Sequence, residues 1–249
     1  MVEKLDVVIA MPAYNEESAI PTFLAEISGA FASVSFRFVV VNDCSTDNTE
    51  ETLHALKSTY PLDVQTNPQN AGHGPSTLTA LRLATDLNPQ HVVATDGDGH
   101  ITGATLRDLY NQAPNQKSPT VTEGVRTQRD DPWFRKTVSA ATRKLVKHNS
   151  GSAPQDANTP FRVYPTKLLR EMLENIPADH MTPNLMMATL VRRDGIPFQE
   201  VPITPHKREG TSETGSTWKQ RFRLLPSRRF LEFCVKATGQ WVAPENATP

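Results

Sequence analysis

Short apolar runs alternate with longer amphipathic segments along roughly the first hundred residues, and this alternation limits the possible folds more than any other feature. The apolar runs are residues 5–11, 36–42, 62–66 and 91–95, and the segments with apolar residues at helical spacing are 16–31, 49–60 and 73–87. Strands that alternate with helices of about 10 to 16 residues are typical of right-handed βαβ units, which build a parallel sheet. The pattern predicts an α/β fold, with Thr46 or Asp47 as the N-cap of the second helix.

Beyond residue 110 the alternation is less regular. We expect strands at 120–125, 161–164 and 196–204, helices at 132–148, 166–176 and 182–193, and a loop at 149–160. A chain of 249 residues is long enough for one large α/β domain, and no internal repeat divides it. We expect a single domain with a disordered tail from about Ala243.

A polar cluster follows each of the four apolar runs in the first part of the chain. The clusters are PAYNE at 12–16, NDCSTD at 42–47, NPQNAGHG at 67–74 and DGDGH at 96–100. Ligands of parallel α/β sheets bind beyond the carboxyl ends of the strands. The four clusters are therefore expected to line one edge of the sheet and to form a single site.

The last of these clusters contains two carboxylates that are predicted to bind a metal. Asp96 and Asp98 are two residues apart, so on extended backbone they point the same way and repel each other unless a cation lies between them. Mg²⁺ and Mn²⁺ prefer oxygen ligands and share them with substrate phosphates, and a nitrogen from His100 would favour Mn²⁺. The alternative is a surface turn with solvated aspartates, because Asp-Gly is a common turn dipeptide.

The formal net charge of −1 hides two halves of opposite charge. Residues 1–110 carry 5 Lys and Arg against 14 Asp and Glu, whereas residues 111–249 carry 21 against 13. The basic half is expected to meet an anionic partner, and an unevenly charged solvated surface is the alternative. Cys44 and Cys234 lie far apart, without metal or redox spacing, and are expected to be packed side chains.

Hydrophobic residues make up 37% of the chain, and no apolar stretch approaches the roughly 18 to 20 residues of a membrane-spanning helix. The short apolar run near the N-terminus is flanked by acidic residues and lacks a small-residue cleavage site, so it is a poor signal peptide. We expect a cytoplasmic protein.

Four motifs, in this order and spacing, resemble the nucleotide-sugar domain of the family 2 glycosyltransferases: IAMPAYNEE, VVNDCSTDNT, NAGHGPSTLTALRLA and TDGDGH. The resemblance covers roughly the first 105 residues and implies a single GT-A domain, with a Rossmann-like, mostly parallel sheet flanked by helices. It implies that Asp43 reads the base or ribose and that Asp96 and Asp98 hold the metal on the diphosphate. The other donor-binding residues that it implies are Pro12, Ala13, Tyr14, Glu16, Asn70 and Gly72.

The second half resembles a subfamily, the polyprenyl-phosphate (dolichol-phosphate mannosyltransferase-like) sugar transferases. The similar stretches are VTEGVR, DANTPFRVYPTKLL and FQEVPITPHKREGTS. The resemblance implies that Arg126, Arg162 and Arg208 face phosphate and that His100 is a third metal ligand. The sequence departs from the family pattern at Asn42, where many relatives carry an acid, and at Pro160, which stiffens its loop.

The function implied is metal-dependent, inverting transfer of a sugar from a UDP- or GDP-linked donor to an acceptor, with a polyprenyl phosphate favoured. Arg208 and Lys207 would donate to the leaving diphosphate. A phosphate acceptor is already anionic, whereas a hydroxyl needs a base, for which Asp156, Asp131 and Asp130 are the candidates. We favour Asp156, and the alternative is that it caps a turn or pairs with an arginine.

The chain is expected to divide into a nucleotide-sugar half (1–110), an acceptor half (111–215) and a C-terminal amphipathic segment with its tail (216–249). The basic helix at 132–148 either binds phosphate on the acceptor side or is a solvated charged surface. The C-terminal segment mixes aromatic and arginine residues, which suits peripheral contact with an anionic membrane or packing on the domain.

The sequence is also consistent with other functions. The acceptor could be a modified DNA base, because basic and aromatic residues bind nucleic acid, or a soluble glycan, small molecule or protein hydroxyl. A nucleotidyltransferase is a rival enzyme class, but residues 11–17 lack the glycine-rich, basic phosphate loop that it would need. A non-catalytic module that binds a nucleotide sugar without turnover is the alternative of another class.

Overall fold

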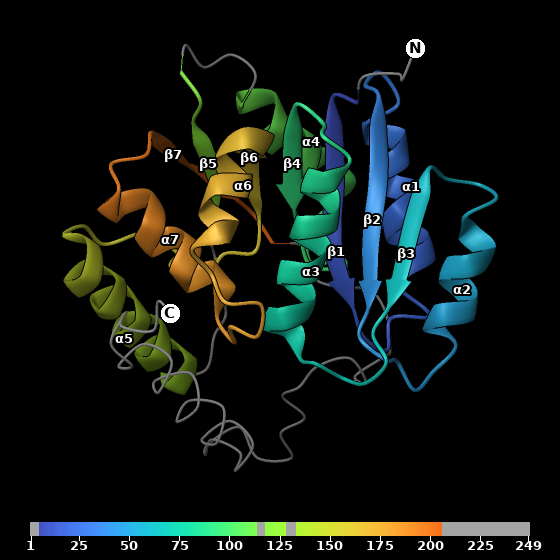
Figure 1. Ribbon diagram of the computed structural model, residues 1–249, viewed down its shortest axis with the longest axis horizontal. Helices are drawn as coiled ribbons and strands as arrows, with labels where there is room; N and C mark the ends of the chain where they lie inside the picture. Colours follow the sequence, from blue (N-terminus) through green and yellow to red (C-terminus); the bar gives the residue numbers. More distant parts are fainter. Residues whose placement is uncertain (1–4, 114–117, 128–132, 206–249) are drawn as a thin grey trace.

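The computed structural model describes residues 5–113, 118–127 and 133–205, in which a seven-stranded sheet runs in the order β3-β2-β1-β4-β6-β5-β7 (Figure 1). The strands are β1 (Val7–Ala13), β2 (Phe36–Asn42), β3 (Leu62–Thr66), β4 (His91–Ala94), β5 (Val121–Arg126), β6 (Arg162–Pro165) and β7 (Phe198–Ile203). The helices are α1 (Ile20–Ala30), α2 (Thr49–Leu56), α3 (His73–Asp86), α4 (Gly103–Gln112), α5 (Trp133–Ser150), α6 (Thr166–Glu174) and α7 (Pro183–Arg193).

The sheet is mostly parallel, as the sequence predicts. β1 pairs in parallel with β2 and β4, β2 with β3, and β5 with β7. β6 is the exception, because it runs antiparallel to both β4 and β5. Two strands that are both antiparallel to a third point the same way, so the carboxyl ends of β4 and β5 lie at one edge of the sheet. The sheet is therefore continuous across the predicted boundary at residue 110.

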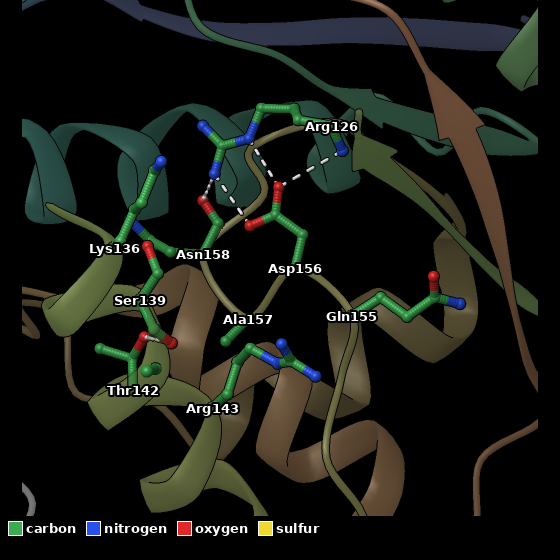
Figure 2. A pocket seen from close by; sticks show the side chains of 10 residues that line it. Arg126, Lys136, Ser139, Thr142, Arg143, Gln155, Asp156, Ala157 and Asn158 are labelled. Carbon is green, nitrogen blue, oxygen red and sulfur yellow. Dashed lines mark hydrogen bonds and ion pairs between the residues drawn. The ribbon is translucent and has the colours of Figure 1, made fainter. Parts of the chain in front are cut away.

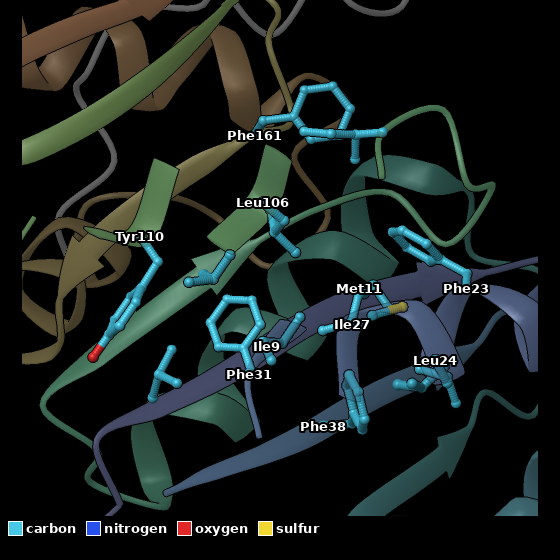
Figure 3. Packing of buried hydrophobic residues seen from close by; sticks show 14 of the residues in the cluster. Ile9, Met11, Phe23, Leu24, Ile27, Phe31, Phe38, Leu106, Tyr110 and Phe161 are labelled. Atoms are coloured by element: carbon cyan, nitrogen blue, oxygen red, sulfur yellow. The ribbon is translucent and has the colours of Figure 1, made fainter. Parts of the chain in front are cut away.

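Each face of the sheet is covered by helices and buries its own apolar layer. Alternate residues of β1 point to opposite faces. Ile9 and Met11 join the layer under α1 and α4, which also contains Phe31 and Phe38 (Figure 3), and Val8 joins the layer under α3, α6 and α7. Burial on both faces explains why β1 and β2 read as continuous apolar runs rather than as alternating ones.

Local predictions were wrong at two helix starts, and a third helix was missed. The N-cap of α2 is Asn48 rather than Thr46 or Asp47, because residues 43–48 form a loop that contacts the loop after β1. α1 begins at Ile20 rather than at residue 16 for the same reason. α4 was not predicted at all, although Thr102 caps it by accepting a hydrogen bond from the amide of Thr105 at 3.2 Å.

The basic helix α5 packs on α7 at the end of the sheet where the parallel strands terminate (Figure 1). Val146 of α5 lies against Leu185 and Ala188 of α7, and Ala157 completes this small cluster. Lys136, Arg143, Lys144 and Lys147 of α5 are exposed. Within the described residues, no helix combines the length and the apolar character needed to cross a membrane.

Candidate active site

The strand order reverses between β1 and β4, and the four polar clusters meet at the carboxyl ends of these strands and their neighbours. Successive strands are added on one side of β1 as β2 and β3, and then on the other side as β4. Such a switch point leaves a crevice in which ligands of open α/β sheets bind. The contacts described below join the four clusters into one site, as the sequence predicts.

The loop after β1 and the loop after β2 are held together by side-chain hydrogen bonds. The amide of Asn15 donates to Oγ of Ser45 at 3.0 Å, and its side-chain oxygen accepts from the amide of Thr46 at 2.8 Å. Glu17 accepts from the amide of Asn48 at 2.9 Å. Asn15 takes a left-handed backbone conformation (φ 56°), which asparagine tolerates better than most residues. The polar character of these loops therefore serves their own structure as well as any ligand.

Asp43 orders the loop that leads into α3. Its carboxylate is buried and accepts from the amides of Ala71 at 2.8 Å and Gly72 at 2.9 Å, and from the side chain of Asn67 at 2.9 Å. Asn70 donates to the carbonyl oxygen of Asp43 at 3.1 Å. The predicted contact with the base or ribose remains a prediction, and the geometry adds a structural role that the motif alone did not indicate.

Asp96 and Asp98 follow β4 with partly exposed carboxylates, and the glycine between them is sterically required. A Cβ at Gly97 would lie 2.7 Å from the carbonyl oxygen of Pro12, so only glycine lets this turn pack against the end of β1. Nε2 of His73 lies 3.4 Å from Oδ1 of Asp96, and Nε2 of His100 lies 3.2 Å from Oδ2 of Asp98. Each aspartate thus has its own histidine neighbour.

The predicted three-ligand metal set of Asp96, Asp98 and His100 is not assembled. Among the residues that the structure describes, no three His, Cys, Asp or Glu side chains are grouped so as to hold a metal ion. His100 contacts Asp98 directly instead. The two carboxylates still fit a cation that takes its remaining ligands from substrate phosphates and water, which is how Mg²⁺ is usually bound.

The other donor residues predicted from the first loop differ in exposure. Tyr14 is 36% exposed and is available for stacking on a ring. Pro12, Ala13 and Glu16 are buried, so contact with a nucleoside through Pro12 or Ala13 would have to use the main chain. The amide of Glu16 donates to Oγ1 of Thr49 at 2.8 Å.

A basic pocket of about 260 Å³ lies between α5 and the loop before β6 (Figure 2). It is lined by Arg126, Lys136, Ser139, Ala140, Thr142, Arg143, Gln155, Asp156, Ala157 and Asn158. Arg126 donates two hydrogen bonds to the carboxylate of Asp156, from Nε to Oδ2 at 2.6 Å and from a terminal nitrogen to Oδ1 at 2.9 Å. This pairing is the alternative considered for Asp156, and it disfavours the use of that carboxylate as a base, a role that stays a prediction.

Arg162 does not face the site, and the prediction that it faces phosphate is corrected. Its side chain is fully buried in β6. Nε donates to Glu123 at 2.9 Å, and another guanidinium nitrogen donates to the carbonyl oxygen of Thr159 at 2.8 Å. A buried arginine needs a counter-ion, and Glu123 is that partner. The motif does not indicate the direction in which this arginine points.

Several residues of the site were not singled out from the sequence. His73 lies in the third motif, at the first position of α3. A polar residue between two glycines at the start of a helix could have marked it as a site residue. Glu200 accepts from the amide of Gln155 beside the pocket, and Arg192 donates to Glu200. These three residues have no local signal, because their contacts join distant segments. Lys207, Arg208, Asp130 and Asp131 lie outside the described residues, as does the predicted C-terminal amphipathic segment.

Comparison with solved structures reveals the same architecture elsewhere. S. aureus TarS 1–349 in complex with UDP has a TM-score of 0.55 at 21% identity, over 80% of this chain and 60% of that chain. The mannosyltransferase PcManGT from Pyrobaculum calidifontis, in complex with GDP-Man and Mn²⁺, has a TM-score of 0.55 at 20% identity, over 82% and 57%. Glucosyl-3-phosphoglycerate synthase from Mycobacterium tuberculosis, in complex with UDP, has a TM-score of 0.59 at 17% identity, over 83% and 73%.

These similarities establish the GT-A fold that the motifs imply, and the chain spans about three fifths of the length of the first two structures. The family is established by the sequence. The family model for glycosyl transferase family 2 matches residues 8–176, about two thirds of the chain, and that match includes the carboxylates after β4 and all of the residues that line the pocket. The chain therefore belongs to glycosyl transferase family 2.

Proposed function

We propose that this protein is an inverting, metal-dependent glycosyltransferase that moves a sugar from a nucleoside diphosphate sugar to an anionic acceptor, with a polyprenyl phosphate favoured. The observation that carries the proposal is the arrangement of two charged sites at one edge of one sheet. Asp96 and Asp98 follow β4, and Arg126 ends β5, whose carboxyl end lies at the same edge. A cation-binding pair for the donor thus shares an edge with a basic pocket for the acceptor.

On the donor side, the residues after β1 and β4 support a bound nucleoside diphosphate. Tyr14 would stack on the base, and the main chain of Pro12 and Ala13 would line the nucleoside. The solved relatives that hold UDP, or GDP-Man with Mn²⁺, support a UDP- or GDP-linked donor. A divalent cation held by Asp96 and Asp98 would neutralise the charge that develops on the leaving diphosphate. Lys207 and Arg208 stay predicted as further donors to that group.

On the acceptor side, the pocket favours an oxygen nucleophile that is already ionised. Arg126, Lys136 and Arg143 bring three positive charges to it. Asp156 is the one carboxylate among the described residues that line the pocket, and both of its oxygens accept from Arg126. A phosphate oxygen attacks the anomeric carbon without a base, forming the new carbon–oxygen bond as the bond to the diphosphate breaks on the opposite face. A hydroxyl would need proton removal by a group that is engaged elsewhere.

The test is sugar transfer in vitro with the full chain. Sugar-labelled UDP and GDP donors are incubated with Mn²⁺ or Mg²⁺ and a short-chain polyprenyl phosphate, and label is followed into the lipid fraction. Label that appears only in aqueous glycan, protein or nucleic acid would reject the lipid phosphate acceptor. Nucleotide sugar that binds without release of nucleoside diphosphate would identify a non-catalytic module.

Pocket variants link the activity to the geometry. Lys136→Gln and Arg143→Gln each remove a charge that lines the pocket, and the KM for the acceptor should rise about tenfold or more, as expected when a charge-assisted contact is lost. Lys167→Gln is the matched control, because Lys167 is a lysine on α6 whose side chain is 90% exposed and lies outside the pocket. The KM for the donor should not change in any of the three.

A further inference from the structure

The pocket loop, residues 154–158, is anchored by charged side chains from three different elements. Nε of Arg143, on α5, donates to the carbonyl oxygen of Pro154 at 3.0 Å. Arg126, at the end of β5, pairs with Asp156 and also donates to the carbonyl oxygen of Asn158 at 3.0 Å. The third anchor is Glu200 on β7, which lines no part of the pocket. A short loop held at this many points has little freedom to shift the groups that it presents.

Glu200 holds the middle of this loop through Gln155. Oε1 of Glu200 accepts from the main-chain amide of Gln155 at 2.7 Å, and Oε2 accepts from its side-chain amide at 2.9 Å. Gln155 immediately precedes Asp156, whose carboxylate pairs with Arg126 in the pocket (Figure 2). Displacement of Gln155 would therefore move the carboxylate that orients Arg126.

Glu200 is itself oriented by buried charges behind the pocket. Glu123 and Glu200 stand directly opposite each other on β5 and β7, a placement in which like charges repel. A terminal nitrogen of Arg192 lies between them and donates to Glu123 at 2.8 Å and to Glu200 at 3.0 Å. The guanidinium of Arg192 also lies 4.3 Å from the ring centroid of Phe198. Both carboxylates are therefore held in place by one arginine from α7.

We propose that Glu200 is a positioning residue for the pocket. Through Gln155 it holds the pocket loop, and with it the Asp156–Arg126 pair, in the arrangement that binds an anionic group. The inference rests on the proposed function in that the anion is taken to be the acceptor phosphate. Glu200 does not line the pocket, so its effect passes through the loop.

Two substitutions separate this role from a general contribution to stability. Glu200→Ala removes both acceptors from Gln155. Glu200→Gln keeps an oxygen for the main-chain amide, and the side chain of Gln155 can turn its own oxygen toward the new amide group, so the loop should stay in place. Ile27→Val in α1 is the control, because it trims the apolar core beneath α1 and α4 without contacting the loop, at a cost of about 0.5–1.5 kcal/mol.

The probe is inorganic phosphate, titrated into the full-length protein and followed by NMR at the amides of residues 155–158, with UDP binding measured separately. We expect Glu200→Ala to weaken phosphate binding about tenfold and to speed hydrogen exchange at the amide of Gln155, with unchanged affinity for UDP. The affinity of Glu200→Gln for phosphate should stay within about threefold of the wild-type value. The affinity of Ile27→Val for phosphate should equal that of the wild type.

Unchanged phosphate affinity and unchanged exchange at Gln155 in Glu200→Ala would overturn the inference, as would an equal loss of affinity in Ile27→Val. A wild-type protein that binds no phosphate would instead overturn the anionic acceptor. The exchange rate of Gln155 would then still decide the positioning role: faster exchange in Glu200→Ala alone supports it, and equal rates reject it.

Discussion

Replacing Glu123 by glutamine tests how much of the free energy of unfolding depends on one buried charge. Glu123 is 1% exposed and is the shared partner of two arginines, with Oε1 bound to Arg162 at 2.9 Å and Oε2 bound to Arg192 at 2.8 Å. Glutamine keeps the shape and one oxygen acceptor but removes the negative charge. Arg192 retains Glu200, whereas the other hydrogen-bond acceptors of Arg162 among the described residues, Thr159 and Asn184, are neutral.

The expected loss is about 3–5 kcal/mol, which is typical when one partner of a buried ion pair is removed and the other charge is left uncompensated. The free energy of unfolding of a domain is usually about 5–15 kcal/mol, so the variant should still fold, but with a much smaller free energy of unfolding. With an m-value of about 2–3 kcal/mol/M, the urea midpoint should fall by about 1–2.5 M. Equilibrium urea unfolding, followed by far-UV circular dichroism, measures this shift.

The control is an ion pair with similar geometry in a different environment. Arg37 and Asp63 are 2.9 Å apart, but their side chains are 38% and 48% exposed. Arg37→Gln should therefore cost about 1 kcal/mol or less, because solvent screens exposed pairs. If the midpoint of Glu123→Gln lies within about 0.3 M of the wild type, or no lower than that of Arg37→Gln, the argument from desolvated charge is refuted.

Three further predictions concern packing, pH and metal binding. A Cβ at Gly74 would lie 2.6 Å from the carbonyl oxygen of His180, so Gly74→Ala should lower the free energy of unfolding by about 1–3 kcal/mol. A Cβ at Gly29 in α1 would meet nothing within 4 Å, so Gly29→Ala should raise the free energy of unfolding by about 0.5–1 kcal/mol in the same urea assay. Burial lowers the pKa of His91 and of His180, so folding favours their neutral imidazoles. Their contribution to the free energy of unfolding is full above about pH 6.5 and is lost as the pH falls below that value, by at most about 1.4 kcal/mol per pH unit for each histidine. The melting temperature of a His91→Gln variant should therefore depend less steeply on pH than that of the wild type. Asp98→Asn should weaken Mn²⁺ binding in the presence of UDP by at least about tenfold, measured by electron paramagnetic resonance of free Mn²⁺, and unchanged binding would exclude Asp98 as a ligand.

The donor edge of the sheet could be predicted closely from the sequence. β2 and β3 match the predicted runs 36–42 and 62–66, and the clusters that follow the strands meet at one edge. These features depend on local patterns, because β2 is an apolar run of the kind that central strands carry, and because ligands bind beyond the carboxyl ends of parallel strands. The prediction fails at the N-cap of α2, where Asn48 contacts Glu17 from the preceding loop.

The acceptor side was harder to predict because its residues are placed by contacts between distant segments. Asp156 was singled out as a base, but its partner Arg126 lies 30 residues away in sequence and takes up both oxygens. Arg162 carries the same charge as Arg126 and was expected to face phosphate as well. β6 runs antiparallel between β4 and β5, and this placement turns Arg162 toward Glu123 in the interior. Residue type alone does not distinguish the two.

By itself, the sequence determined the α/β class, the approximate positions of the first four strands along the chain, the shared edge and the family, because hydrophobic periodicity and short motifs are properties of neighbouring residues. Only the tertiary structure decided which charged residues face a ligand and which pair with each other. Glu123 and Arg192 are 69 residues apart and Gln155 and Glu200 are 45 apart, and these pairs arise from strand register and helix packing. A charge becomes structural or functional according to the partner that the fold brings to it, and that partner lies elsewhere in the chain.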